Sequence, residues 1–588
     1  MKRCPECRRD YYDDTLLYCL DDGNALLEGP ATGKSEPPAS AGGQFDEPQT
    51  AILHSTATPG EAATRAQINT TDQTAILNTG ASAEPRVSLG ESSEKRSFSA
   101  HRSAKPLLVV LGLAVIMLGG FFGYRYITQA KQIESIAVMP FLNDSENSDM
   151  EYLSDGMTES LINSLSQIPN LSVKARSSVF RYKGKEPDLK TVAAELNVQA
   201  VLTGHIVKRG ELMTLSLELI DARTENTIWG ERYERKSADI VFLQSEIARD
   251  VSRKLKSKLS PADDQKIAKS YTADPEAYQL YLKGRFYWNK HTGNDLKQAV
   301  DFFNQAIAKD PRYALAYVGL AQAYSDFPGF DVAPANESMP LAKAAASRAL
   351  EIDDTLADAH TALGYYMLQY EFDLAGSEKE FRRAIELAPN SAEAHSGLAY
   401  RLMLVKRFDE SIAEYGLAEA LDPLALDQSL ADALVYARRY DEAIPRYRLL
   451  LAKSPNSALL YGYLGWVYGA KGMYAEAVTE ARKSVELNNA YFLKGYLGLW
   501  LAKAGNREEA QKILAELKTA SIDGYVRPNT LAMVYIGLGD KEEGLNQLEK
   551  EVSSHGPLAN RLGITPEFDD VRSEPRFKAL LKRMGLPE

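Results

Sequence analysis

The sequence of 588 residues predicts a multidomain protein with a small zinc ribbon, a disordered linker, one transmembrane helix, an α/β domain and an all-α solenoid of helical repeats. Three observations carry this prediction. All three cysteines lie within the first 19 residues, an uncharged apolar stretch occupies residues 106–124, and a period near 34 residues runs through the second half. The composition, with 45% hydrophobic and 25% charged residues, is that of ordinary globular domains.

Residues 1–27 carry the pattern of a metal site. Cys4 pairs with Cys7, and Cys19 pairs with Asp22, each with two residues between them, a spacing that lets one tight turn present two ligands to zinc. A module of this size needs a metal or a disulfide to fold, and an odd cysteine count favours metal. We therefore expect a structural zinc ion on these four residues, in a head that resembles short bacterial zinc ribbons. A metal-free tail is the alternative.

The linker at residues 28–105 is rich in Pro, Gly, Ser, Thr and Ala and nearly lacks aromatic residues, so we expect it to be disordered. The segment QTAIL occurs twice in it, at 49–53 and 73–77. Thr50 and Thr74 are therefore candidate phosphorylation or docking sites. Drift within a low-complexity segment would give the same repeat.

The apolar stretch PLLVVLGLAVIMLGGFFGY at 106–124 is long enough, as a helix of about 28 Å, to cross a bilayer. A buried helix of a soluble domain is the alternative. Four basic residues flank it on the N-terminal side and two on the other, which favours a cytoplasmic N-terminus and an extracytoplasmic C-terminal part. We expect a single-pass protein of the inner (cytoplasmic) membrane. The spacing of Gly119 and Gly123 would let two such helices form a homodimer.

Residues 133–257 alternate strand and helix patterns. Continuous apolar runs or alternating residues predict strands at 135–141, 171–175, 199–208, 212–221 and 227–235, and helical periodicity predicts helices at 152–168, 189–196 and 240–255. This order predicts helices packed on a mixed sheet.

Three motifs of this module carry a family resemblance: Asp155-Gly156, Gly204, and Trp229 with Tyr233. By them the module resembles the TolB amino-terminal-like domain, which implies a non-catalytic interaction or sensing domain. Trp229 and Tyr233 either line a cleft or, as large aromatics on a strand, pack in the core.

Residues 275–556 repeat every 32 to 34 residues, and each unit carries two amphipathic helical patterns. The pattern resembles tetratricopeptide repeats (TPRs). We expect eight units starting near 277, 314, 357, 392, 424, 458, 491 and 525, a loop at 327–340, and a terminal cap at 557–588.

The resemblance implies a groove lined by the first helix of each unit. Its positions carry over to Tyr365, Tyr400, Asp432, Trp466, Leu499 and Met533. This lining is neutral and lacks a Lys, Arg and Asn cluster, so we expect an extended or helical peptide held by apolar anchors. Stacking of the same aromatics between neighbouring units is the alternative.

No phosphate-binding loop, nucleophile elbow or metal-binding His pair occurs, so we expect no enzyme activity and no cofactor besides zinc. The net charge of −12 argues against a nucleic-acid partner. The sequence thus predicts a membrane-anchored scaffold or sensor that binds proteins or peptides. The alternatives are a cytoplasm-facing adaptor that recruits signalling proteins, a regulatory component of a kinase or transcription pathway, and an enzyme hidden in the α/β module.

Overall fold

The computed structural model divides into two compact units, Met1–Thr128 and Gln129–Glu588. In the first unit, three two-residue strands form an antiparallel sheet in the order β2-β1-β3. They are β1 (Lys2–Arg3), β2 (Asp10–Tyr11) and β3 (Leu27–Glu28). The structure describes residues 2–3, 10–11, 27–28, 133–145, 150–185, 188–236, 239–255, 269, 271–330, 332–424, 428–523, 526–556 and 558–588.

Several predictions for the first unit fall outside these described residues. They are the four predicted zinc ligands, the linker with Thr50 and Thr74, and the apolar stretch at 106–124. Across the described ranges, no helix has the length and apolar character needed to cross a membrane.

The α/β module is a mixed sheet with helices, as the sequence predicts. The sheet has the order β6-β4-β7-β8-β9, with β5 also paired to β7; β4, β5, β6 and β7 run parallel, and β7, β8 and β9 are antiparallel. Its strands are β4 (Ser135–Val138), β5 (Leu142–Asn143), β6 (Ser172–Val173), β7 (Ala200–Arg209), β8 (Leu212–Asp221) and β9 (Asn226–Lys236). Its helices are α2 (Glu151–Ser166), α3 (Arg176–Val179), α4 (Leu189–Leu196) and α5 (Ile240–Lys254).

The first predicted strand, 135–141, is too long. The chain keeps one further hydrogen bond, from the Met139 amide to the Leu202 carbonyl, and then leaves the ladder of β4. Pro140 follows, and a proline has no amide hydrogen to continue the pairing. The chain resumes as the separate strand β5, which pairs farther along β7.

The three sequence motifs of the module have packing roles. A Cβ on Gly204 would lie 2.6 Å from Phe141, so only glycine fits that close approach. Trp229 and Tyr233 are 8% and 4% exposed and belong to the core, and the Tyr233 hydroxyl donates a hydrogen bond to Asp250 (2.9 Å). Of the two predicted roles for these aromatics, the structure favours packing.

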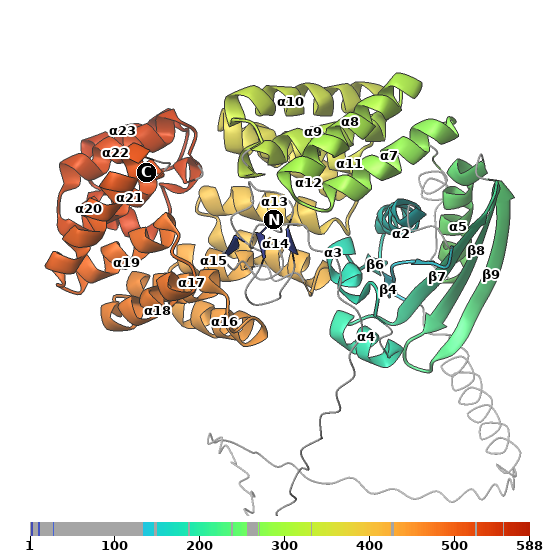
Figure 1. Ribbon diagram of the computed structural model, residues 1–588, viewed down its shortest axis with the longest axis horizontal. Helices are drawn as coiled ribbons and strands as arrows, with labels where there is room; N and C mark the ends of the chain where they lie inside the picture. Colours follow the sequence, from blue (N-terminus) through green and yellow to red (C-terminus); the bar gives the residue numbers. More distant parts are fainter. Residues whose placement is uncertain are drawn as a thin grey trace, which may run out of the picture. The chain divides into compact units, whose positions relative to one another are not determined.

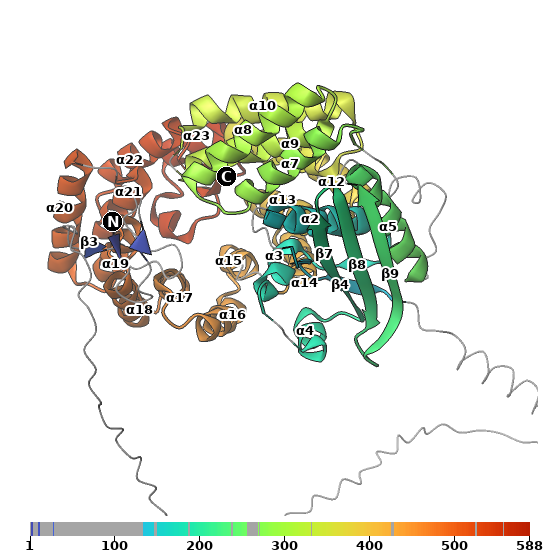
Figure 2. The ribbon, with the colours of Figure 1, turned by 45° about the vertical axis from the view of Figure 1, so that its right-hand side comes forward.

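The helical repeats form eight helix pairs within the described residues, and Figures 1 and 2 show them continuing one after another from α7 to α22. The first helices of the pairs are α7 (Pro275–Trp288), α9 (Ala314–Asp326), α11 (Ala357–Tyr366), α13 (Ala392–Leu404), α15 (Ser429–Tyr436), α17 (Ala458–Ala470), α19 (Tyr491–Lys503) and α21 (Pro528–Leu538). The second helices are α8 (Gly293–Lys309), α10 (Ala335–Ile352), α12 (Leu374–Leu387), α14 (Phe408–Leu421), α16 (Tyr440–Lys453), α18 (Tyr474–Leu487), α20 (Arg507–Asp523) and α22 (Lys541–Ser553).

Equivalent residues of different units make equivalent contacts. His360 and His395, 35 residues apart, each place Nδ1 against a glutamate of the following helix and Nε2 against a backbone carbonyl. Ser391 and Ser457 each accept a hydrogen bond from the backbone amide three residues on, and so cap α13 and α17.

The predicted loop at 327–340 is wrong in its second half. A short 3-10 turn (Phe327–Phe330) occupies its start, but α10 already begins at Ala335 and contains Pro340. The C-terminal residues fold as two 3-10 turns (Ala559–Arg561 and Pro566–Val571) and α23 (Pro575–Arg583).

The α/β module is docked on the first repeat. Helix α2 touches the sheet and α5 on one side and α7 on the other, as both ribbon views allow the reader to follow (Figures 1 and 2). The contact of α2 with α7 is close at Gly156, where a Cβ would lie 2.8 Å from Leu282. The sequence motif Asp155-Gly156 therefore marks this docking surface.

Candidate functional site

A cavity of about 510 Å³, which we call the repeat cavity, lies along the first helices of the third to eighth pairs. Aromatic side chains form much of its wall, and Ser396, Gln428 and Asn529 add polar groups. The aromatic residues in its lining are Tyr365, Tyr400, Tyr415, Tyr436, Tyr463, Trp466, Phe492 and Tyr496.

Five of the six positions predicted for the groove line this cavity: Tyr365, Tyr400, Asp432, Trp466 and Met533. Leu499 is fully buried in the core instead.

The lining aromatics also pack against other helices, which was the alternative role. The ring of Tyr365 meets Phe381 edge to face at 5.1 Å, and Trp466 meets Tyr436 of the preceding unit at 5.2 Å. These residues thus hold neighbouring helices together with one part of the ring and line the cavity with another.

The expectation of a neutral lining is wrong. Arg527, Arg561 and Asn529 line the repeat cavity, and the two arginines do not stand at a groove position of the repeat pattern. Asp432, the acidic residue among the described lining residues, accepts a hydrogen bond from Tyr447. No local sequence signal marks Arg561, because it reaches the cavity from a turn that follows the last repeat.

The turn Ala559–Arg561 crosses back to the fourth repeat. Arg561 Nε donates a hydrogen bond to the Tyr400 hydroxyl (2.9 Å), and this hydroxyl donates to Asn560 Oδ1 (2.8 Å). The guanidinium carbon also lies 5.3 Å from the centre of the Tyr400 ring, within the range of a cation–π contact. The C-terminal segment is therefore a wall of the cavity as well as a cap.

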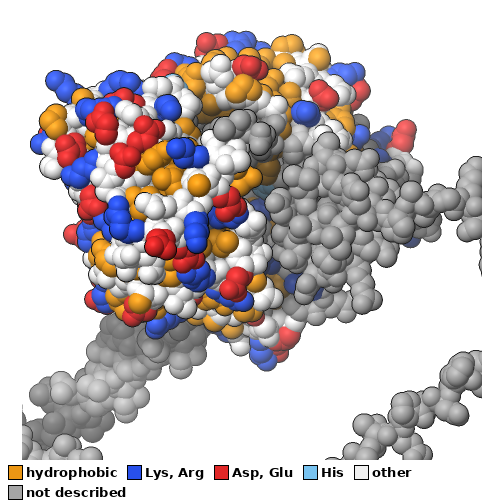
Figure 3. Space-filling model, turned by 60° about the vertical axis from the view of Figure 1, so that its left-hand side comes forward, with side chains coloured by type: hydrophobic (Ala, Val, Ile, Leu, Met, Phe, Trp, Pro, Cys, Tyr) orange, Lys and Arg blue, Asp and Glu red, His pale blue; other side chains and the backbone are white. Residues whose placement is uncertain are grey.

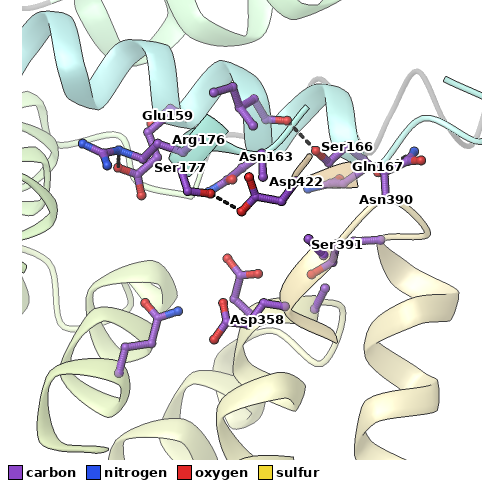
Figure 4. Close-up of a pocket in the computed structure, with 18 of the residues that line it drawn as sticks. Glu159, Asn163, Ser166, Gln167, Arg176, Ser177, Asp358, Asn390, Ser391 and Asp422 are labelled. Atoms are coloured by element: carbon purple, nitrogen blue, oxygen red, sulfur yellow. Dashed lines mark hydrogen bonds and ion pairs between the residues drawn. The ribbon is translucent and has the colours of Figure 1, made fainter. Parts of the chain in front are cut away.

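A second cavity of about 480 Å³, the seam cavity, lies between the α/β module and the first five helix pairs. Figure 4 shows Glu159 and Arg176 on its module side and Asp358, Asn390 and Ser391 on the repeat side. The two cavities share Ser396 and Tyr415 in their linings, so they adjoin along the first helices of the repeats.

Glu159 joins the two sides of the seam cavity. Glu159 is 5% exposed. Its carboxylate accepts hydrogen bonds from Arg285 Nε (2.8 Å) and from the Asn289 side-chain amide (2.8 Å), both in the first repeat. Arg176 of its own module approaches it at 3.2 Å. Arg285 further bonds Gln322 of the second repeat. The buried charge is thus fully partnered across the boundary between module and repeats.

Three other carboxylates line the seam cavity and differ from Glu159 in having no ion pair among the described residues: Asp358, Glu393 and Asp422, the last of which accepts hydrogen bonds from Ser177 and Ser178. Glu393 is exposed to water within the cavity, and the surrounding cavity walls, the nearby charge of Asp358 and that of Asp326 raise its pKa to about 7, although Arg285 opposes the shift. Burial also raises the pKa of Asp358, with Arg285 opposing and Glu159 adding to the effect. At neutral pH the Glu393 carboxyl is therefore partly protonated.

The outer surface offers fewer clues. On the face drawn in Figure 3, hydrophobic, acidic and basic side chains are interspersed, so this face carries both signs of charge. Among the described residues, no group of three or more His, Cys, Asp or Glu side chains is arranged to hold a metal ion.

Comparison with known proteins finds a match for each module. Residues 131–250 match the family model described as HilA/YgeH-like transcriptional regulator, second domain, and residues 429–491 match a model of the tetratricopeptide repeat. Transcriptional regulator HilA of Salmonella typhimurium is 21% identical over 443 residues, which cover 74% of this chain and 71% of that protein. The chain thus combines a tetratricopeptide repeat region with a HilA/YgeH-like second domain. The predicted likeness to the TolB domain remains a prediction beside this match.

The protein named "Putative adenylate cyclase 3" of Rhizobium meliloti is 32% identical over 230 residues, 39% of each chain. The chain therefore spans about two fifths of the length of that relative. Two solved repeat proteins are also similar. YrrB, titled a TPR protein with an unusual peptide-binding site, is 18% identical with a TM-score of 0.26, over 32% of this chain and 94% of that one. A tetratricopeptide repeat protein from Parabacteroides merdae is 14% identical with a TM-score of 0.34, over 45% of this chain and 99% of that one. TM-scores this low carry no argument about binding.

Proposed function

We propose that this chain is a non-enzymatic regulatory protein that binds a segment of a partner protein in the repeat cavity and acts in a signalling or transcription pathway. The observation that carries the proposal is the docking of the HilA-like module on the repeats through the buried carboxylate of Glu159. Because the two modules share one buried charge network, we expect a structural change in the repeats to alter the contacts of the regulator module.

The likeness to HilA supports a regulatory role more than an extracytoplasmic scaffold, because it spans both modules rather than the repeats alone. It also removes much of the support for the expectation of no nucleic-acid partner, since HilA is named a transcriptional regulator. Membrane anchoring, the inner-membrane location, the structural zinc and the homodimer remain predictions for residues outside the described ranges.

The test compares transcripts and bound proteins in a host that carries the full-length wild type, a deletion, or one of two variants. Tyr365→Ala opens the wall of the repeat cavity, whereas Tyr491→Ala removes a tyrosine that is 41% exposed and does not line it. We expect Tyr365→Ala to lose a crosslinked partner and to reproduce part of the transcript change of the deletion, and Tyr491→Ala to match the wild type. Unchanged transcripts in the deletion would remove the regulatory proposal.

A further inference from the structure

The repeat cavity contains a cation without a counter-ion. Arg561 lines the cavity, and among the described residues its guanidinium makes no ion pair; its hydrogen-bonding partners are neutral phenols, the Tyr400 hydroxyl on Nε and the hydroxyl of Tyr436. The phenol of Tyr436 lies beside it. A cation in such surroundings is stabilised strongly by any anion that reaches it, because little water screens the attraction.

One other polar group of the same wall lacks a hydrogen-bond partner among the described residues. Asn529 is 6% exposed, and its side-chain oxygen has no hydrogen-bond partner among the described residues. Its amide is therefore free to turn and present either its oxygen or its NH₂ group to a ligand. Arg527, exposed at the rim, adds a second positive charge. Asp432 is the one acidic residue among the described lining residues, so it offsets one of these two positive charges.

The position of Arg561 is fixed before any ligand binds. Tyr400 holds Nε on one side, Asn560 holds the Tyr400 hydroxyl, and the flanking residues Ala559 and Leu562 are 1% and 0% exposed. A guanidinium held in place loses little conformational entropy on binding and presents its nitrogens as a planar fork. The two oxygens of a carboxylate match this fork, as do two oxygens of a phosphate.

We propose that the repeat cavity recognises an acidic side chain, Asp or Glu, in an internal segment of the partner protein, with its carboxylate seated on Arg561 and its neighbouring residues packed on the surrounding aromatic rings. This proposal rests on the proposed function and names the chemistry of the partner.

An internal segment fits better than a chain end. Arg561 contacts the fourth repeat, while the cavity extends past it to Tyr365 of the third repeat and to Met533 of the eighth. On one side the lining continues through Ser396 and Tyr415 into the seam cavity. The guanidinium therefore lies along the cavity and not at a closed end, so a bound chain has room on both sides of its carboxylate.

The test measures binding of full-length protein to arrays of eight-residue peptides that are acetylated and amidated at their ends. The central residue is Glu, Gln or Lys, and the flanking positions vary among apolar and aromatic residues. A fourth set has no acidic side chain but a free C-terminal carboxylate. The variants are Arg561→Met, which removes the charge but keeps the length of the side chain, and Arg583→Met as a matched control, because Arg583 is exposed on α23 and does not line the cavity.

We expect the best Glu peptides to bind the wild type and the Arg583→Met variant about ten- to a hundredfold more tightly than their Gln counterparts. With Arg561→Met this preference should fall to about onefold while the apolar selection persists. If that variant does not fold, Tyr400→Phe, which frees the guanidinium from its support, should reduce the preference by several-fold. Equal binding of Glu and Gln peptides, or binding of the free-carboxylate set alone, would overturn the inference but leave the proposed function standing. Binding to none of the four sets would count against both.

Discussion

Glu159 is the residue whose removal should most disturb the contact between the α/β module and the repeats. Replacing it with alanine leaves Arg285 and Arg176 without their shared carboxylate and leaves the Asn289 side-chain amide without its 2.8 Å acceptor. The side chains of Arg285 and Arg176 are 11% and 23% exposed, so water does not fully replace the lost partner.

The size of the effect follows from this burial. Removing one partner of a buried ion pair costs about 3–5 kcal/mol, because a desolvated charge is left behind. Replacing both partners by apolar residues of similar size avoids that orphaned charge. We therefore expect Glu159→Ala to destabilise the protein by about 3 kcal/mol or more, and the double variant Glu159→Leu with Arg285→Met to be less destabilised than the sum of its two single variants.

Urea unfolding of the full-length protein gives these free energies, and hydrogen exchange shows where the protection is lost. The loss should concentrate in α2 and α7, which face each other across the boundary, and should leave α17 to α22 unchanged. The reasoning fails if Glu159→Ala unfolds at the wild-type urea concentration. It also fails if the free-energy changes of the two single variants simply add in the double variant.

Three further predictions test other parts of the structure. Gly156→Ala brings a Cβ to 2.8 Å from Leu282 and should lower the free energy of unfolding in urea by about 1–3 kcal/mol. The second substitution Leu282→Ala should be needed to relieve this clash. An unchanged urea midpoint for Gly156→Ala would contradict the close approach. Because the folded pKa of Glu393 is raised to about 7 from 4.5, its protonated form favours folding at low pH, and this contribution is lost as pH rises from about 4.5 through 7. The melting temperature of Glu393→Gln should therefore rise relative to the wild type from pH 5 to pH 8, whereas a constant difference would refute the shift. Cys4→Ser should lower the zinc content of the full-length protein measured by elemental analysis from one ion per chain, and a wild type purified without zinc would refute the predicted ribbon.

Periodicity in the sequence predicted the elements of the folded part well. Six of the eight predicted repeat starts fall within two residues of an observed helix start, and the long strands of the α/β module agree to within one residue at each end. These elements are long and strongly patterned, so local sequence specifies them. The errors lie where tertiary contacts decide: Pro140 divides a strand, and residues 335–340 begin a helix within a segment rich in loop residues.

The two cavities were harder to predict. The groove positions followed from the repeat pattern, and five of the six line the repeat cavity. Arg561 and Arg527 belong to no repeat position, and only the fold brings Arg561 to Tyr400, 161 residues away in sequence. The seam cavity was not predicted at all, because it exists only where α2 meets the repeats. No sequence pattern indicates that the two modules dock on each other. Sites made by one repeating element can be read from sequence, whereas sites made by contact between distant segments cannot.

The docking of the two modules constrains how the chain can respond to a ligand. Residues of both modules line the seam cavity, with Asn163 on α2 and Asp358 on α11, so the cavity would not persist if α2 moved away from the repeats. Any group that binds only in the intact cavity therefore stabilises the docked arrangement in proportion to its affinity and concentration. The adjoining repeat cavity shares Ser396 and Tyr415 with it, so a ligand that shifts either side chain in one cavity alters the wall of the other. A partner segment held at Arg561 thus has a physical route, through α13 and α14, to the boundary at which the regulator module is held.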